Sequence, residues 1–368
     1  MFKVLVLATA FSLALASSAF AADLPSRKAP AYISPPPAAL WTGVYVGLNA
    51  GYGWGAASNA TTVTTPLFDG VAYGANNLDP LNARGGLISG VTALANSGVA
   101  NVNQNGFVVG GQIGYNYQWG SSFVVGAEAD FQGATIGGRG TYSGLSHDGM
   151  SFVDPPTYPC AVSNDLGGTC VLSRSAVGVG SISAGVDWMG TVRGRLGYLF
   201  TPTLLVYGTG GLAYGGVQAS ANHVAFAQGT LSGLNIPIPP QSPILFPPAP
   251  YNGATNFLPV PGVGSISDTR VGWTAGGGVE WMFLPNWSMK LEALYYDLGG
   301  ATLSSSPVAA LSPFAVPARV LAPVGVSAGQ LLIANAPATR VRFDGVIVRA
   351  GVNYHFNWAA PAPVLAKY

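Results

Sequence analysis

The segment at residues 349–356, RAGVNYHF, alternates strictly between two kinds of side chain. In an extended strand, neighbouring side chains point to opposite faces. The alternation separates apolar residues from small or polar ones: Val352, Tyr354 and Phe356 on one face, Arg349, Gly351, Asn353 and His355 on the other. One face suits lipid and the other suits a wet interior, so the segment predicts the last strand of a transmembrane β-barrel.

The composition supports a barrel over other folds. Only 8% of the 368 residues are charged, whereas 49% are hydrophobic and 51 are glycine. This is less charge than the surface of a soluble protein normally carries. A helical membrane protein needs apolar runs of about 20 residues, and beyond the N-terminus Gly, Ser, Thr and Asn interrupt every run. The net charge of +1 also gives no basic surface for nucleic acid, which we do not expect as a partner.

The first residues have the form of an export signal. Lys3 supplies a positive end, residues 4–16 form an apolar stretch, and residues 19–21 are a small-x-small cleavage site. An uncleaved anchor helix is the alternative, and the short apolar stretch disfavours it. We therefore predict a signal peptide at 1–21 and a mature N-terminus at Ala22. Residues 22–40 contain five prolines and predict an extended periplasmic linker.

Eight segments between residues 41 and 356 alternate with period two. They lie at 42–55, 106–118, 123–133, 187–200, 204–215, 270–283, 287–298 and 342–356. We predict an all-β fold, an eight-stranded antiparallel transmembrane β-barrel over 41–356, followed by a periplasmic tail at 357–368. Aromatic residues gather near the strand ends, as in the two interfacial girdles of such barrels.

The connections between these segments alternate in length. Short ones lie at 119–122, 201–203 and 284–286, and long ones lie at 56–105, 134–186, 216–269 and 299–341. Outer membrane barrels have short periplasmic turns and long extracellular loops, so we expect four long extracellular loops and both termini in the periplasm. Extra hairpins above the membrane remain an alternative, although the proline-rich run at 237–261 is not expected to form one.

The charged residues in mid-strand share the face that points away from lipid. They form a balanced set of four acids and four bases: Glu128, Asp130, Arg193, Arg195, Glu280, Lys290, Glu292 and Arg349. The interior of an eight-stranded barrel is just wide enough to be filled by side chains, and enclosed charges must be paired. We therefore predict a lumen ion-pair network that plugs the barrel, with a narrow pore lined by the same ring of charges as the alternative.

An enzyme at the outer rim is a further alternative. The chain has three histidines, and His147 next to Asp148 is the pair best suited to acid–base chemistry. Catalytic groups usually come together from distant segments, so neighbouring residues are weak evidence. We expect no enzymatic activity and no cofactor.

Two cysteines lie ten positions apart, at Cys160 and Cys170. In an oxidising compartment a pair this close most simply forms a loop disulfide. A thiolate metal site normally needs four ligands, and His147 is the nearest candidate, so we expect no metal.

Several motifs resemble the small outer membrane proteins of alphaproteobacteria, the porin-family or RopB-type major outer membrane proteins. They are the run ADLP at 22–25, WTGVYVG at 41–47, GYGWG at 51–55, GTGGLAYG at 208–215 and the closing strand at 349–356. The resemblance implies an OmpA-like eight-stranded barrel with a role in envelope integrity and surface contacts, in outer membrane lipid and lipopolysaccharide. It leaves a porin-like channel for small solutes as the alternative function.

The resemblance also implies two partners. Arg349, Gly351, Tyr354 and Phe356 match the signal that the barrel assembly machinery reads, although family barrels commonly end at the phenylalanine and this chain continues to residue 368. Proteins of the family that begin Ala-Asp are joined to peptidoglycan in some cases, and Ala22 and Asp23 fit that pattern. A solvated spacer is the alternative role for the linker.

Overall fold

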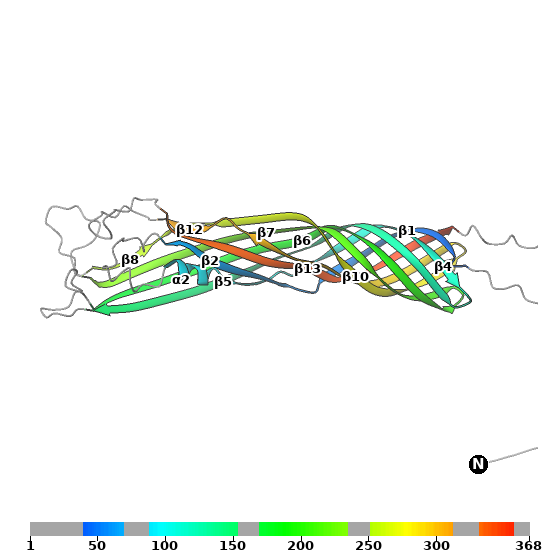
Figure 1. Ribbon diagram of the computed structural model, residues 1–368, viewed down its shortest axis with the longest axis horizontal. Coiled ribbons are helices and arrows are strands. Elements are labelled where there is room, and N and C mark those ends of the chain that lie inside the picture. The colour runs from blue at the N-terminus through cyan, green and yellow to red at the C-terminus, as the bar shows by residue number, and fades with distance from the viewer. Residues whose placement is uncertain (1–39, 70–87, 154–168, 235–250, 312–330, 357–368) are drawn as a thin grey trace, which may run out of the picture. The chain divides into compact units, whose positions relative to one another are not determined.

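A computed structural model describes residues 40–69, 88–153, 169–234, 251–311 and 331–356. Eight long strands form a closed antiparallel ring in the order β1-β4-β5-β6-β7-β10-β11-β13, and β13 pairs back with β1. Their bounds are β1 (Gly43–Gly55), β4 (Asn105–Trp119), β5 (Phe123–Val153), β6 (Thr169–Thr201), β7 (Leu204–Leu234), β10 (Gly262–Leu284), β11 (Trp287–Ser304) and β13 (Leu331–Phe356). The predicted eight-stranded antiparallel barrel is confirmed (Figure 1).

The ring closes between the first and last strands. Val44 lies opposite Phe356, and the ladder runs without a break to Gly55 opposite Gly345. At the same end of the barrel lie the three short connections, between Trp119 and Phe123, Thr201 and Leu204, and Leu284 and Trp287. Gly120 and Asn286 adopt φ values of 67° and 72° in two of these turns, a region that glycine and asparagine enter most easily. The short turns are thus as predicted.

Two belts of outward-facing aromatic rings mark the membrane span. At the turn end, Trp287 contacts Tyr354 with ring centroids 5.2 Å apart. At the other level, Trp273 contacts Tyr295 at 5.3 Å. On β11 the two belts enclose nine residues, from Trp287 to Tyr295, which is the length of a tilted strand that crosses a bilayer. No helix among the described residues is both long and apolar enough to cross a bilayer.

The four long connections were predicted as extracellular loops, with extra hairpins above the membrane as the alternative, and for much of their length the structure has the paired strands of that alternative. β5 runs on to Val153, β6 begins at Thr169, and the two pair from Ile136 opposite Val186 up to Val153 opposite Thr169. The ring therefore continues well beyond the outer aromatic belt, into a region that we call the extracellular extension. Its inner face carries small and β-branched apolar residues in regular alternation, which suits a strand that covers an apolar core.

Shorter elements complete the extracellular extension. They are β2 (Asn59–Asp69), α2 (Ile88–Ala95), β3 (Gly98–Asn101), β8 (Tyr251–Asn256), β9 (Leu258–Val260) and β12 (Val308–Leu311). β2 pairs with β13 and β3, β8 pairs with β7, and β12 pairs with β13 and β9. β8 and β9 lie within the proline-rich run at 237–261, which was not expected to form an extra hairpin, and in its described part these two strands pair with β7 and β12 and not with each other. Residues 235–250 lie outside the described part.

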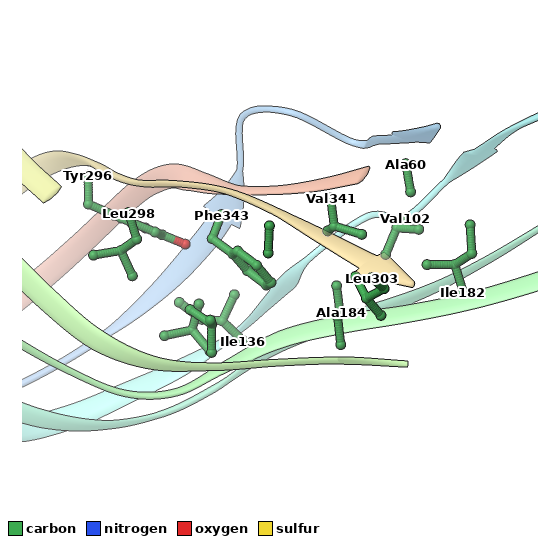
Figure 2. Packing of buried hydrophobic residues seen from close by; sticks show 14 of the residues in the cluster. Ala60, Val102, Ile136, Ile182, Ala184, Tyr296, Leu298, Leu303, Val341 and Phe343 are labelled. Atoms are coloured by element: carbon green, nitrogen blue, oxygen red, sulfur yellow. The ribbon is translucent and has the colours of Figure 1, made fainter. Parts of the chain in front are cut away.

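An apolar core fills the interior of the extracellular extension. Ile136, Ile182, Leu303, Val341 and Phe343 are buried together, with no more than 2% of any of them exposed. Figure 2 shows them converging from strands on different sides of the ring. The helix α2 lies in the same region, where Val91 and Ala95 pack against Ala176. The barrel thus has an apolar interior above the membrane span.

The position of the membrane span is testable with a matched pair of substitutions. Leu291 faces outward midway between the aromatic belts and is 53% exposed, whereas Leu145 faces outward in the extracellular extension and is 76% exposed. An arginine at the bilayer midplane costs about 2–4 kcal/mol, so we expect Leu291→Arg to lower the free energy of unfolding by that amount. Leu145→Arg should change it little.

The measurement is urea unfolding of the two variants after refolding into lipid vesicles. Equal effects of the two substitutions would contradict the assignment of the membrane span.

Candidate functional site

The eight charged residues of the predicted network all lie inside the barrel at the level of the membrane. Each is at most 4% exposed: Glu128, Asp130, Arg193, Arg195, Glu280, Lys290, Glu292 and Arg349. The register of the strands sets acids beside bases, because Glu128 lies opposite Arg193, Glu280 opposite Lys290, and Glu292 opposite Arg349. The structure therefore brings together every residue of the predicted set.

Arg193 and Arg349 share the carboxylate partners Asp130 and Glu292. We call these four residues the upper part of the network, because they lie nearer the extracellular extension than Arg195 and Glu280 do. Arg193 donates from Nη1 to Glu292 Oε1 at 2.9 Å and from Nη2 to Asp130 Oδ2 at 2.9 Å. Arg349 donates from Nε to Glu292 Oε2 at 2.8 Å and from Nη2 to Asp130 Oδ2 at 2.7 Å. The two acids are thereby clamped between two guanidinium groups, which bind carboxylates with fixed directions.

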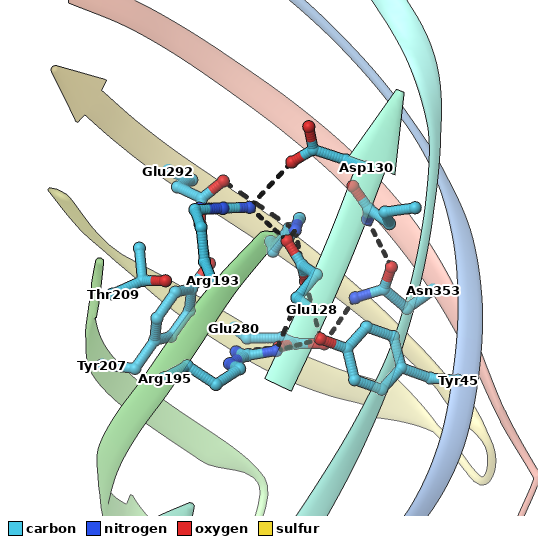
Figure 3. A network of polar contacts seen from close by, with 12 residues as sticks. Tyr45, Glu128, Asp130, Arg193, Arg195, Tyr207, Thr209, Glu280, Glu292 and Asn353 are labelled. Atoms are coloured by element: carbon cyan, nitrogen blue, oxygen red, sulfur yellow. Dashed lines mark hydrogen bonds and ion pairs between the residues drawn. The ribbon is translucent and has the colours of Figure 1, made fainter. Parts of the chain in front are cut away.

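Glu128 joins the upper part of the network to Lys290. The lysine donates from Nζ to both carboxylate oxygens of Glu128, at 2.8 and 2.9 Å. Arg193 Nη2 donates to Glu128 Oε1 as well. Two cations therefore donate to this carboxylate, and Arg195 and Arg349 each lie 3.7 Å from it. Figure 3 shows Glu128 and Arg193 facing each other inside the barrel.

Arg195 and Glu280 form the lower part of the network. Arg195 donates from Nη2 to Glu280 Oε2 at 2.7 Å, and its guanidinium lies 3.9 Å from the centre of the Tyr207 ring. Tyr45 links the two parts, because its hydroxyl accepts from Arg195 Nη1 at 2.9 Å and donates to Glu128 Oε2 at 2.7 Å (Figure 3). The eight charges thus belong to one connected network.

Neutral side chains also belong to this network, and sequence reasoning did not assign them to it. Ser288 and Asn353 both donate to Glu280 Oε1, at 2.5 and 2.7 Å, and Gln112 donates to Asn353 at 2.5 Å. His355 Nε2 lies 2.8 Å from Ser288 Oγ. Ser288, Asn353 and His355 share the inward parity of the charged residues on their strands, so the alternation alone could have identified them, whereas Gln112 lies on β4, which has no charged residue.

A tryptophan closes the turn end of the lumen. Trp41 is completely buried just before β1, and its Nε1 donates to the Pro202 carbonyl at 3.0 Å. Its ring meets that of His355 edge-on at 5.7 Å. The other side chains of its apolar cluster are Val124, Leu199, Leu205, Tyr207 and Met282. The interior is therefore filled at three levels: the Trp41 cluster, the ion network and the apolar core of the extracellular extension.

One histidine is buried in the extracellular extension. The imidazole of His223 is fully buried, with Nδ1 3.2 Å from the Tyr142 hydroxyl and Nε2 3.2 Å from Thr339 Oγ1. Burial lowers the pKa of His223 to about 4, because the apolar surroundings disfavour the charged imidazolium. The ring is therefore neutral at pH 7.

The other candidate residues fall in different places. Arg349 belongs to the ion network, Gly351 faces the lumen, and Tyr354 and Phe356 face outward at the turn-end belt, with ring centroids 5.0 Å apart. A Cβ atom at Gly351 would lie 2.9 Å from the Leu48 carbonyl oxygen, so packing alone requires glycine there. Recognition of this segment by the assembly machinery stays a prediction.

The remaining predicted sites are not described by the structure. Ala22, Asp23 and Cys160 lie outside the described residues, and so do the signal peptide and the tail at 357–368. Cys170 lies in β6, but its side chain is not described. The disulfide therefore stays a prediction.

The side chains of His147 and Asp148 do not point toward the same place, so they do not form an acid–base pair. As neighbours in β5 they lie on opposite faces of the strand. Asp148 lies 3.5 Å from Arg174, and His147 Nε2 lies 3.3 Å from Ser173 Oγ. Among the described residues, no group of three or more His, Cys, Asp or Glu side chains could hold a metal ion.

A closed ring of eight strands with lipid-facing aromatic belts defines an outer membrane β-barrel protein. The family model for the outer membrane protein beta-barrel domain matches residues 173–356. The 31 kDa outer-membrane immunogenic proteins of Brucella melitensis and Brucella suis are each 30% identical to this chain over 292 residues, which is 78% of this chain and 84% of the relative. The chain belongs to this family of outer membrane β-barrel proteins, and its location is the cell outer membrane.

Among solved structures, the outer membrane protein OprG from Pseudomonas aeruginosa aligns with this chain. The alignment covers 86% of this chain and 97% of OprG, with 9% identity and a TM-score of 0.31.

Removing one cation from the ion network should destabilise the barrel. Loss of one partner of a buried ion pair leaves an uncompensated charge, so we expect Arg193→Met to lower the free energy of unfolding by about 3–5 kcal/mol. Arg342→Met is the matched control, because Arg342 donates to Asp297 at 2.6 Å on the outside of the barrel. Urea unfolding in detergent micelles measures both, and an Arg193→Met variant as stable as Arg342→Met would contradict a stabilising network.

The neutral His223 predicts acid sensitivity of the extracellular extension. In the unfolded chain histidine has a pKa of about 6.5, so below that pH the unfolded state binds a proton that the folded state excludes until about pH 4. Stability is therefore complete above pH 6.5 and falls as the pH approaches 4, by up to about 3 kcal/mol.

We expect His223→Gln to remove this loss, and His147→Gln, at an exposed histidine, to retain it. Urea unfolding at pH 7.5 and 4.5 tests this expectation. The same acid-dependent loss in both variants would show that His223 is not its source.

Proposed function

We propose that this outer membrane barrel is a non-conducting, non-enzymatic structural protein that contributes to envelope integrity and surface contacts. The observation that carries the proposal is the filling of the lumen by the ion network. Hydrated ions cross a pore only where water or weakly held side chains can solvate them. Here Arg193, Arg195 and Arg349 reach across the lumen to acids on other strands, and each is at most 4% exposed.

The layers on either side of the ion network support the same reading. On the turn side lies the Trp41 cluster, and on the outer side lies the apolar core around Phe343 and Leu303. A solute that passed along the axis would have to displace all three layers. Barrels with open aqueous lumens have roughly 16–18 strands, whereas eight strands leave room only for side chains.

Conductance in planar lipid bilayers distinguishes this proposal from a channel for small solutes. We expect no steady single-channel steps from the wild-type protein, with an open 16-stranded porin in the same bilayers as the positive control. Steady steps whose size changes in the Arg193→Met variant would contradict the proposal and favour the channel.

We further propose that the linker at 22–40 tethers the barrel to peptidoglycan through the amine of Ala22. The described chain enters β1 at the turn end, which faces the periplasm in outer membrane barrels. The 19 linker residues would span roughly 60 Å at about 3.1 Å per residue if fully extended. Mass spectrometry of muropeptides from purified sacculi should detect an adduct that carries Ala22 and Asp23, and its absence would contradict the tether while leaving the barrel's structural role intact.

The extracellular extension supports a role in surface contacts. Its outer face carries exposed Leu145 and Phe226, at 76% and 52%, beyond the membrane span. The Brucella relatives are called immunogenic outer-membrane proteins, which fits a family exposed at the cell surface. Protease treatment of intact cells should cleave this extension, and resistance equal to that of a periplasmic protein would contradict the orientation.

A further inference from the structure

A polar hollow lies on the outer wall of the extracellular extension. Its volume is about 440 Å³, and its polar lining is Arg139, Ser181, Ser183, Ser220, Asn222 and Ser265. These residues come from four neighbouring strands, β5, β6, β7 and β10. Neither the ion network nor the apolar core uses any of them.

The register of the strands sets the lining in two rows. In one row Arg139 lies opposite Ser183, Ser183 opposite Ser220, and Ser220 opposite Ser265. In the other row Ser181 lies opposite Asn222. Directly opposite side chains on neighbouring strands are about 5 Å apart, so the hollow presents an array of hydroxyl groups with one amide and one guanidinium at its edge.

Arg139 is the cation of the hollow, and it is free to bind. Its side chain is exposed and makes no ion pair or hydrogen bond with any residue that the structure describes. No carboxylate lines the hollow, and Asp187, further along β6, accepts a hydrogen bond from Gln218 at 2.6 Å. An exposed guanidinium with no acid beside it favours a phosphate or carboxylate ligand.

The hydroxyl array adds a second kind of recognition. Serine hydroxyls and the Asn222 amide both donate and accept hydrogen bonds, as the hydroxyl groups of a sugar do. Ser183 Oγ and Ser220 Oγ lie 2.7 Å apart, so these two hydroxyl groups are hydrogen-bonded to each other. The lining therefore suits a saccharide that carries an anionic group more than it suits a bare phosphate.

The distance of the hollow from the membrane surface indicates where such a saccharide would come from. On β5 and β6 the outer aromatic belt is marked by Phe131 and Trp188, whose rings stack with centroids 5.6 Å apart. Ser183 precedes Trp188 by five residues, and Arg139 follows Phe131 by eight. At about 3.3 Å per residue and a tilt of about 45°, the hollow lies roughly 12–20 Å above this belt. The outer leaflet of the outer membrane is made of lipopolysaccharide, whose core sugars with their phosphate and carboxylate groups extend through this zone.

We propose that the hollow around Arg139 binds an anionic core saccharide of lipopolysaccharide. Arg139 pairs with a phosphate or carboxylate on the sugar, and the Ser183, Ser220 and Asn222 side chains bond its hydroxyl groups. The site anchors the extracellular extension in the saccharide layer. It depends on the outer membrane location and not on whether the lumen conducts.

Isothermal titration tests the site with the mature protein folded in detergent micelles. The probe is the phosphorylated core oligosaccharide released by deacylation from the lipopolysaccharide of the bacterium that makes the protein. Loss of a charge-assisted contact should weaken its binding about tenfold or more in Arg139→Gln. Ser220→Tyr, which fills the hollow without changing the charge, should weaken it as well.

Arg340→Gln is the matched control, because Arg340 is an exposed cation of β13 that does not line the hollow. It should bind the oligosaccharide as the wild type does. Each variant is first checked for the heat-dependent shift in gel mobility that marks a folded barrel. The proposal is overturned if Arg139→Gln binds normally, if both arginine variants weaken binding equally, or if inorganic phosphate binds as tightly as the oligosaccharide.

Discussion

The pairing of four carboxylates with four cations inside the membrane span is the constraint on which the rest of the barrel depends. Each buried ion loses several kcal/mol of hydration, which only close partners and hydrogen bonds offset. The eight side chains come from five different strands, β5, β6, β10, β11 and β13, so the partners meet only when the ring has closed. The buried charges are therefore neutralised only when the barrel is closed and its strands pair in the correct register.

This network also fixes the pairing register of the glycine-rich strands. Strands with many small residues specify their register weakly through hydrophobic contacts, and the membrane-spanning parts of β7 and β10 include GTGGLAYG and GGG. A slip by one residue would turn Glu280 toward lipid, and a slip by two would remove it from Arg195. Glycine in turn makes room for the network, since a Cβ atom at Gly114 would clash with the Tyr45 ring. The charged residues thus fix the register of the glycine-rich strands, and the glycines leave space for the side chains of the network.

The sequence predicted the membrane part of the barrel because its alternation has a large contrast there, with apolar or aromatic residues facing lipid and charges facing the lumen. The strands of the extracellular extension were only an alternative in the sequence analysis, because there the contrast between the two faces is inverted. Apolar Ile182 and Ala184 face inward and Ser181 and Ser183 face outward. In β6 a bulge between Val186 and Trp188 also changes the inward-facing residues from even numbers in the extracellular extension to odd numbers in the membrane span, so no single alternation runs through the strand.

The candidate site also has a part that could be predicted from the sequence and a part that could not. Parity alone was enough to gather the eight charges, because a charge inside a membrane strand has only one tolerable face. The links through Tyr45, Ser288 and Trp41 depend on which strands are neighbours and at what height, and this comes from the register. The hollow at Arg139 depends on the register of four strands in the extracellular extension, and no strands or pairing were assigned there from the sequence.

A double-mutant cycle on Arg195 and Glu280 tests most directly whether the ion network stabilises the barrel. Unfolding in urea is measured for the wild type, Arg195→Met, Glu280→Gln and the double variant. If these groups are paired as the structure has them, at 2.7 Å and buried, the coupling energy should be about 1.5–3 kcal/mol. A coupling energy near zero, with single variants as stable as the wild type, would contradict the account.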